Sequence, residues 1–235
     1  MADGELPRMP GAPRLAFQQC SDRNVLRAHR RPADRGSFAV TDSSSSMKQV
    51  PTDAGEVYRV LCGRRTVHDF KAEPVPEALI LRAIDSARWA PNHHRTEPWH
   101  FYLLGAKART RIAELNAELV RDSRGERAAE IKLKRWLAMP GWLILTCVNS
   151  DDAVRAREDY AACCCAAQNM MLYLWAVGAG AKWTTGAVVD LDAFYEAAGI
   201  VRERETVVGM FWYGWPATIS EQHRKPVDAL VDRIE

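Results

Sequence analysis

Apolar residues recur at helical spacing from about residue 52 onward. The first such pattern predicts a helix that Thr52 or Asp53 can cap and that ends near Gly63. The second predicts a helix from Pro76 to about Trp89, because proline is tolerated at the first helical position. Two short helices therefore precede the first predicted strand.

Strands and helices alternate over the rest of the chain. The apolar run Trp99–Leu104 comes after a polar loop and is predicted to be a strand. Two helical patterns come next and end before Pro140; they pass through Ile112, Leu115 and Leu119, and through Ile131 and Trp136. Trp142–Val148 is predicted to be a strand buried on both faces, and Val207–Tyr213 a last strand. This order predicts a layered α/β or α+β domain without internal repeats.

The stretch Ala161–Ala181 carries no charged residue and is long enough to cross a bilayer. It is rich in Ala, Cys and Gly, carries Gln168 and Asn169 in its middle, and stands alone as a candidate. We therefore predict a central buried helix. The three thiols of Cys163–Cys165 would point in three directions from such a helix, so at most one faces any pocket, and we interpret them as small apolar residues.

Residues 1–46 differ in character from the rest of the chain. They contain several prolines and arginines and the run Ser43–Ser46, without sustained apolar periodicity. Such a segment cannot bury enough apolar surface to offset its ordering entropy, and it lacks the apolar core of a signal peptide. We interpret it as an irregular extension, either a floppy tail or an arm that packs on a partner subunit. The folded domain is predicted at 47–235, with Met47 as a plausible start.

Composition narrows the class of protein. With 235 residues, 47% apolar and 26% charged, the chain can fold without disulfides or a structural metal. Its 32 basic and 30 acidic side chains leave a net charge of +2, which argues against a nucleic acid or an anionic membrane as partner. Half of the six cysteines are adjacent to one another, which favours reduced thiols and a cytoplasmic protein.

Familiar cofactor and metal motifs are missing from the sequence. No GxxxxGK[ST] loop is present, and the nearest approach to GxGxxG, at Gly178–Trp183, lacks the third glycine and comes after a helix. His93-His94 and Cys163–Cys165 are adjacent residues, and adjacent ligands rarely converge on one tetrahedral ion. We therefore expect neither a Rossmann dinucleotide site nor a metal.

Three polar clusters are the candidates for chemistry. Gly63–Thr66 places two guanidinium groups and a hydroxyl just past a helix end, where they either hold a phosphate or complement the helix dipole. Ala90–Trp99 is a loop between two prolines, either a fixed scaffold for polar groups or a solvated turn. Lys182–Gly186 offers an aromatic ring and two hydroxyls, either for a planar ligand or as ordinary core.

Taken in order, five segments resemble the FMN-dependent nitroreductase family, and its compact bacterial members most of all. They are Arg64–Thr66, the helix introduced by Pro74–Pro76, Ala90–Phe101, Trp183–Gly186 and Val208–Pro216. The resemblance extends from about Val57 to the C-terminus. It implies an α+β fold, a three-layer α-β-α sandwich, that dimerises through a long interface helix. It also implies a homodimer with two FMN sites, each lined by both chains.

The resemblance also implies which residues bind the cofactor. They are Arg64, Arg65, Thr66, His93, Thr96, Trp183, Thr184, Thr185 and Arg224. The first three would hold the phosphate and ribityl chain together with a basic residue after the last strand, Arg224 or Lys225. His93 of the partner subunit and Trp183–Thr185 would approach the rest of the flavin. The phosphate of FMN carries close to two negative charges, which suits this set.

Glu97 departs from the family pattern, because many relatives have an amide near this position. A carboxylate cannot donate a hydrogen bond to a flavin ring unless it is protonated. We therefore expect Glu97 to face elsewhere, paired with Arg95 or a helix end, and leave it out of the site.

The reaction that the resemblance implies is a ping-pong transfer of hydride from NADH or NADPH, through the flavin, to a small nitroaromatic or quinone acceptor. Because the flavin carries this chemistry, no acid or base side chain is required and no catalytic residue is predicted. Two alternatives stay open. One is an FMN enzyme of other chemistry, such as a dehydrogenase, a dehalogenase or a flavin-destroying enzyme, and the other is a non-catalytic flavin-binding protein.

Overall fold

The computed structural model describes residues 53–234, so the predicted extension 1–46 and its boundary at residue 47 lie outside the described residues. Contacts divide the chain into two units, Met1–Gly55 and Glu56–Glu235, and the helices and strands belong to the second, apart from the first residues of α1. Within the described part the chain forms six α-helices and four strands. The helices are α1 Ala54–Gly63, α2 Glu77–Ala87, α3 Ala106–Arg124, α4 Glu126–Leu137, α5 Ala153–Ala176 and α6 Asp192–Ala198. The strands are β1 Trp99–Leu103, β2 Gly141–Val148, β3 Gly180–Thr184 and β4 Glu205–Gly214.

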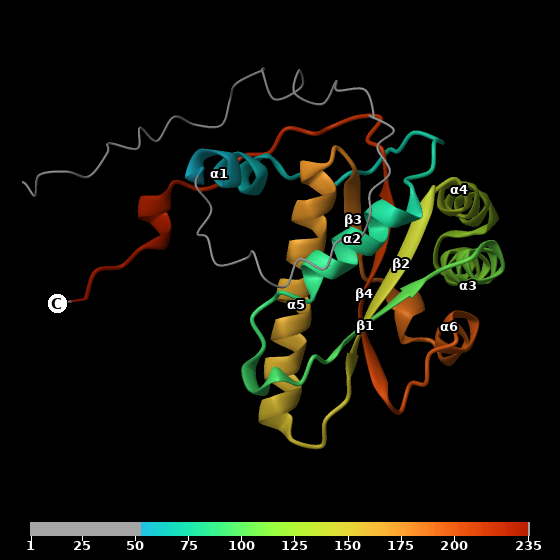
Figure 1. Cartoon of the computed structure of the whole chain (residues 1–235). Helices are drawn as coiled ribbons and strands as arrows, with labels where there is room; N and C mark the ends of the chain where they lie inside the picture. The colour runs from blue at the N-terminus through green and yellow to red at the C-terminus, as the bar shows by residue number, and fades with distance from the viewer. Residues whose placement is uncertain (1–52, 235) are drawn as a thin grey trace, which may run out of the picture. The chain divides into compact units, whose positions relative to one another are not determined.

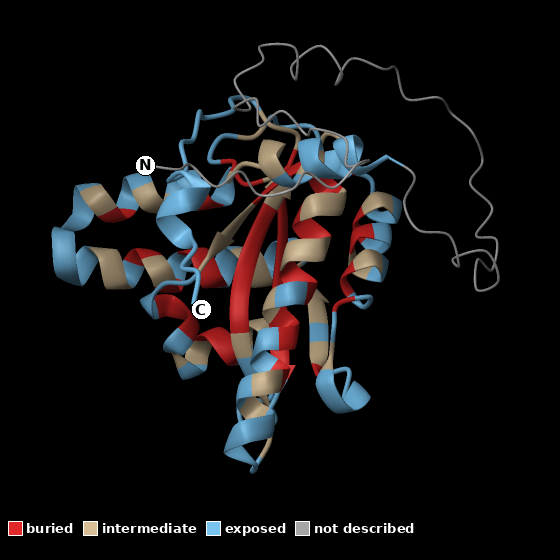
Figure 2. Cartoon of the chain, turned by 90° about the vertical axis from the view of Figure 1, so that its left-hand side faces the viewer, coloured by how far each residue is buried: buried red, intermediate tan, exposed pale blue. Residues whose placement is uncertain are grey.

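The strands form one antiparallel sheet in the order β1-β2-β4-β3. Helices α2 and α5 cover one face, and α3, α4 and α6 cover the other (Figure 1). The α+β prediction is therefore confirmed, and the sheet is the middle of three layers. Figure 2 shows the burial that results, concentrated on the central strands and on the sheet-facing sides of the helices.

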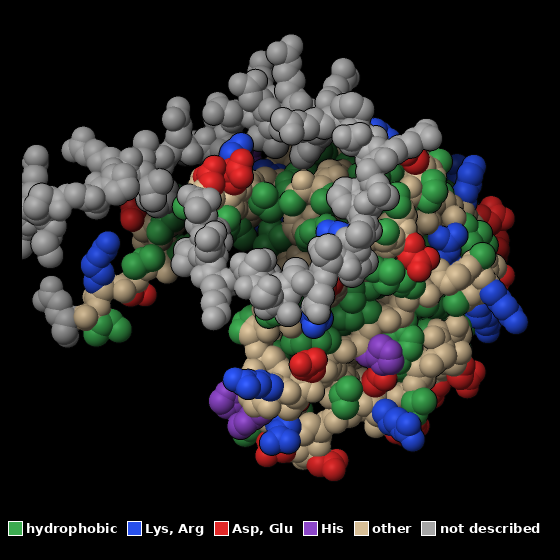
Figure 3. All heavy atoms as spheres, in the orientation of Figure 1, with side chains coloured by type: hydrophobic (Ala, Val, Ile, Leu, Met, Phe, Trp, Pro, Cys, Tyr) green, Lys and Arg blue, Asp and Glu red, His purple; other side chains and the backbone are tan. Residues whose placement is uncertain are grey.

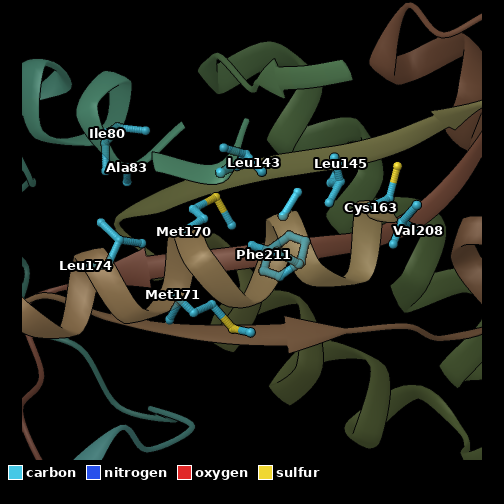
Figure 4. Close-up of a cluster of buried hydrophobic side chains, with 14 of the residues drawn as sticks. Ile80, Ala83, Leu143, Leu145, Cys163, Met170, Met171, Leu174, Val208 and Phe211 are labelled. Atoms are coloured by element: carbon cyan, nitrogen blue, oxygen red, sulfur yellow. The ribbon is translucent and has the colours of Figure 1, made fainter. Parts of the chain in front are cut away.

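The two faces of the sheet carry separate hydrophobic cores, because successive strand residues point to opposite sides. Leu143 and Phe211 pack against α2 and α5, and Met170 and Leu174 of α5 belong to the same core (Figure 4). The neighbouring Ile144 packs on the other side with residues of α3 and α6. The prediction of a strand buried on both faces at Trp142–Val148 is confirmed for all but Val148.

Helix α5 begins and ends earlier than predicted. It starts at Ala153 because the Asp152 carboxylate caps it, accepting hydrogen bonds from the amides of Val154 at 2.8 Å and Arg155 at 3.0 Å. It ends at Ala176, so the last residues of the predicted stretch enter β3 instead.

The three thiols of Cys163–Cys165 are buried, half-buried and exposed in turn, as predicted. Over residues 53–234, no helix has both the length and the apolar character that a membrane span requires.

A network around the partly buried carboxylate of Glu205 connects the strands at this end of the sheet. The Tyr102 hydroxyl lies 3.0 Å from both carboxylate oxygens of Glu205, the Thr146 hydroxyl donates to the same carboxylate, and His100 Nδ1 lies 3.3 Å from Glu205 Oε1. Burial, and then the hydrogen bond to Glu205, raise the pKa of Tyr102 to about 12.

Tyr102 should therefore stabilise the fold in a pH-dependent way. We expect Tyr102→Phe to cost about 1–2 kcal/mol near neutral pH, because it removes a hydrogen bond to a charged acceptor. The folded state holds the phenol proton more tightly than the unfolded chain, whose tyrosine pKa is near 10. The advantage of tyrosine over phenylalanine is therefore complete below pH 10 and disappears as the pH rises toward 12. Denaturant unfolding of both variants between pH 8 and 11.5 measures this difference, and a constant difference across that range would contradict the assignment.

Candidate functional site

A cluster of arginines lies where α1 ends. Arg64 comes directly after the last helical residue and is half-buried. Burial, and then the positive charges of Arg224 and Arg65, lower the pKa of the Arg64 guanidinium, which places all three side chains near one another. Within residues 53–234, none of the three forms an ion pair with a carboxylate. Three uncompensated guanidinium groups at one place are suited to a multiply charged anion.

Arg65 has a structural contact of its own. Its Nη1 atom donates to the carbonyl oxygens of Cys62 at 2.6 Å and Arg64 at 3.0 Å, at the C-terminal end of α1. Arg65 thus complements the helix end, which was one of the two interpretations of this pair. Arg224 donates from Nη2 to Gln222 Oε1 at 2.8 Å and from Nη1 to the His223 carbonyl at 3.4 Å. The side chain of Arg64 has no such contact in the described residues, so Arg64 is the freest anion ligand of the three.

The segment after the arginines runs beside strand β3. Thr66 forms a parallel bridge with Ala181, and the Val67 amide donates to the Ala181 carbonyl at 3.2 Å. The approach is close because Gly180 has no side chain: a Cβ there would lie 2.3 Å from a methyl group of Val67. The fold therefore brings Arg64–Thr66 next to β3, which contains Trp183 and Thr184.

Trp183 is held firmly at the edge of the core. Its indole Nε1 donates to the Val208 carbonyl at 3.2 Å, and its ring packs against Phe211 with centroids 5.2 Å apart. The ring is half-buried, so it belongs to the core on one side and remains accessible on the other. Thr184 is half-buried and Thr185 is exposed. Because Thr66 lies opposite Ala181 in a parallel bridge, Trp183, Thr184 and Thr185 follow along β3 on the side away from Arg64. The cationic cluster is thus followed along β3 by an aromatic ring and two hydroxyls.

The loop from Pro91 to Pro98 is organised by Asn92. Asn92 Oδ1 accepts from the Glu97 amide at 2.7 Å, and its Nδ2 lies 3.0 Å from the Thr96 hydroxyl. That hydroxyl donates to the buried carboxylate of Asp159 on α5 at 2.5 Å. Thr96 therefore anchors the loop to α5. Of the two partners expected for Glu97, Arg95 is not one, because the carboxylate of Glu97 is exposed and forms no ion pair in the described residues.

The two groups of predicted site residues lie at different ends of α5. Asp159, which anchors the loop that carries His93, is near the start of the helix. Trp175, against which Gly63 packs, is near its end. The helical rise between the two positions is roughly 24 Å. Within one chain the structure therefore groups Arg64, Arg65, Thr66 and Arg224 near β3 but leaves His93 and Thr96 apart from them.

Sequence reasoning missed two features of this region. Asp159 carried no signal of its own, because a single acidic residue on a helix is ordinary until its partner is known. Gly180 was noted only as part of an imperfect glycine motif, and its actual role is the close contact with Val67.

Comparison with known proteins agrees with this fold. The structure defines a class of protein: an α+β sandwich with an arginine cluster, suited to an anion, beside an edge strand. The model of the nitroreductase family matches residues 61–215. The chain belongs to the nitroreductase family.

Similar proteins come from several bacteria. The protein named "Putative NAD(P)H nitroreductase YfhC" from Bacillus subtilis is 30% identical over 175 residues, covering 72% of this chain and 89% of its own length. A nitroreductase-like family protein from Bacillus cereus covers 79% of this chain and 100% of its own at 29% identity, with a TM-score of 0.68. The FMN-dependent nitroreductase NfnB from Mycobacterium smegmatis, solved with NADPH, has a TM-score of 0.62, with 76% and 98% of the two chains covered. At 16% identity, this last likeness shows the fold alone.

Proposed function

We propose that this protein is an FMN-dependent oxidoreductase that takes hydride from NADH or NADPH and reduces nitroaromatic or quinone-type acceptors. One observation carries the proposal: Arg64, Arg65 and Arg224 gather without carboxylate partners in the described residues, beside the start of the strand that carries Trp183, in a nitroreductase-family fold. The cysteine pattern supports placing the reaction in the cytoplasm.

The residues present suit FMN. A phosphomonoester carries about −1.5 to −2 charges at neutral pH, and guanidinium groups bind such an anion through paired, charge-assisted hydrogen bonds. Binding would also relieve the repulsion that lowers the pKa of Arg64. Thr66, Thr184 and Thr185 offer hydroxyls nearby, and the accessible side of Trp183 suits a planar ring.

When bound, the flavin supplies the hydride chemistry, so the protein has to bind, orient and shield it. Arg64 and Arg224 would fix the phosphate end. Trp183 has little freedom to move, because its indole N–H and its ring are both held, so it would define one wall of the ring site. No side chain is assigned as an acid or base.

Completing the site requires a second copy of the chain. Asp159, which anchors the loop of His93 and Thr96, lies roughly 24 Å along α5 from Trp175, which packs near Gly63 and the arginine cluster of the same chain. We therefore expect His93 and Thr96 to reach a flavin from a partner subunit. The exposed side of α5 carries small residues that allow close approach, Ala161, Cys165 and Ala176 among them. The exposed side chains of Val57, Tyr58 and Leu61 on α1 add apolar surface. We propose a homodimer with two FMN sites, each lined by both chains.

The test is an absorbance spectrum of the purified protein, recorded before and after anaerobic addition of NADH or NADPH. We expect the visible bands of oxidised flavin, their loss with at least one nicotinamide, and their return when a nitroaromatic or a quinone is added. Protein that neither contains flavin nor binds it on titration would contradict the proposal. Flavin that is bound but resists both nicotinamides would point instead to the alternatives, a flavin enzyme of other chemistry or a non-catalytic flavin-binding protein.

A further inference from the structure

Two adjacent histidines and a glutamate converge on the surface between the Pro91–Pro98 loop and α5. The rings of His93 and His94 have their centroids 3.9 Å apart, and His94 Nε2 lies 3.9 Å from Glu158 Oε2. One ligand atom from each residue lies within 4.8 Å of the others. In Figure 3, histidine side chains gather at the lower left, with Lys or Arg side chains next to them and acidic ones just below, where Figure 1 shows this loop and the first turns of α5.

We propose that His93, His94 and Glu158 form a binding site for a divalent transition metal that prefers imidazole ligands, with Zn²⁺ as the first choice. The sequence argued against a metal because neighbouring side chains usually diverge. In the structure the rings of His93 and His94 do not diverge but lie side by side, with their centroids 3.9 Å apart.

The backbone explains why the two rings meet. In an extended chain, successive side chains point to opposite sides. His94 instead has φ 62° and ψ −1°, and Arg95 has φ 53°, both in the left-handed region that residues with side chains seldom adopt. The turn folds the His94 ring back beside that of His93. The bonds of Asn92 and the Thr96 anchor to Asp159 brace the loop in this form.

The distances suit a metal after small side-chain rotations. Zinc lies about 2.0–2.2 Å from nitrogen and carboxylate ligands, so two ligand atoms of a tetrahedral site are roughly 3.4 Å apart. The three atoms here, within 4.8 Å of one another, need to close by only about 1.4 Å or less. The side chains of His94 and Glu158 are 51% and 36% exposed, which leaves them room to turn.

The ligand set also selects the kind of ion. Two imidazoles and one carboxylate suit zinc and its neighbours in the first transition row, whereas Mg²⁺ and Ca²⁺ prefer oxygen ligands. Three protein ligands leave a fourth position for water, as in open zinc sites. The carboxylate of Asp152 adds negative charge nearby: the amides of Arg155 and Val154 lower its pKa most, and His94 lowers it slightly further.

The metal site does not depend on the proposed flavin chemistry. Each histidine ring has two nitrogens, so His93 can bind a metal through one and keep the other for a flavin of the partner subunit. Metal binding can therefore be measured whether or not the protein contains FMN.

The experiment is isothermal titration of ZnCl₂ into chelator-treated, full-length protein at pH 7.5. We expect one saturable site per chain, weakened at least tenfold by His94→Ala and by Glu158→Gln. His100→Ala is the matched control, because His100 is also an exposed histidine beside a glutamate but lacks a second imidazole. It should bind like the wild type, and MgCl₂ should show no binding.

Thermal unfolding gives a second readout. Zn²⁺ should raise the Tm of the wild type and of His100→Ala but leave that of His94→Ala unchanged, because a ligand that binds only the folded state stabilises it. Absence of saturable binding to the wild type, or equal zinc affinity in the wild type, His94→Ala and Glu158→Gln, would overturn the proposal. The second outcome would assign any bound zinc to other residues.

Discussion

Arg64→Ala is expected to lower the affinity for FMN by roughly 10- to 100-fold. A hydrogen bond to a charged group contributes about 1.5–3 kcal/mol. The guanidinium of Arg64 would donate such bonds to the phosphate, because it has no protein acceptor among the described residues. Purified Arg64→Ala protein should therefore contain far less flavin than the wild type. Titration of flavin-free protein with FMN, followed by the change in flavin fluorescence, measures the affinity directly.

The flavin-free protein distinguishes this role from a structural one. Burial and two like charges already disfavour the Arg64 cation, so its removal should leave the Tm of the flavin-free protein unchanged or slightly higher. Arg64→Lys should show intermediate affinity, because it keeps the charge but loses the paired hydrogen bonds. Arg111→Ala is the control for loss of an exposed arginine, since Arg111 contacts only glutamates of α3 in the described residues. Unchanged flavin affinity in Arg64→Ala would remove the phosphate assignment.

The elements that could be predicted from the sequence are those with long apolar periodicity. The first two helices, the pair α3 and α4, and the strands β1, β2 and β4 all lie where the pattern predicts them. Their apolar residues repeat often enough within one element to reveal which face is buried.

The elements that were missed depend on distant partners. Strand β3 is five residues long and carries Lys182, whose ammonium lies 5.0 Å from the ring centre of Trp212 on β4. Its pairing with β4 and its bridge to Thr66 define it, and neither is visible in local periodicity. Helix α6 has seven residues, too few for a period, and is held by the buried rings of Phe194 and Tyr195.

The candidate site also has a part that the sequence predicts and a part that depends on tertiary contacts. Residue type and order were enough to indicate Arg64 and Trp183, because charge and aromatic character are properties of the residues themselves. The bond from Thr96 to Asp159 and the left-handed turn at His94 arise from tertiary structure and have no local signal in the sequence. The proximity of Arg224 to Arg64 also arises from tertiary structure, and only the resemblance to the family indicated it.

Gly209→Ala is expected to destabilise the domain by about 2–4 kcal/mol. A Cβ at this position would lie 2.0 Å from Nε1 of Trp183 and 2.5 Å from its Cδ1, so the indole has to move. Overpacking of this kind costs about 1–3 kcal/mol, and the displaced ring would also lose its hydrogen bond to Val208, worth about 1 kcal/mol. Denaturant unfolding of the flavin-free protein measures the change.

The local register shows why this glycine is tied to Trp183. Pairing between β2 and β4 passes from Leu145 opposite Gly209 to Thr146 opposite Val207, so Val208 has no partner residue on β2. Its carbonyl accepts the indole N–H, and the bare backbone of Gly209 lets the ring lie flat enough to reach it.

Flavin binding should therefore change together with stability. If Trp183 forms a wall of the ring site, Gly209→Ala should weaken FMN binding even at temperatures where the variant is fully folded. Gly186→Ala is the matched control, because Gly186 directly follows Thr185 but has open space and an extended backbone, with φ −153°. It should change stability by less than about 0.5 kcal/mol. A folded Gly209→Ala variant with wild-type flavin affinity would show that the position of Trp183 serves the core and not the cofactor.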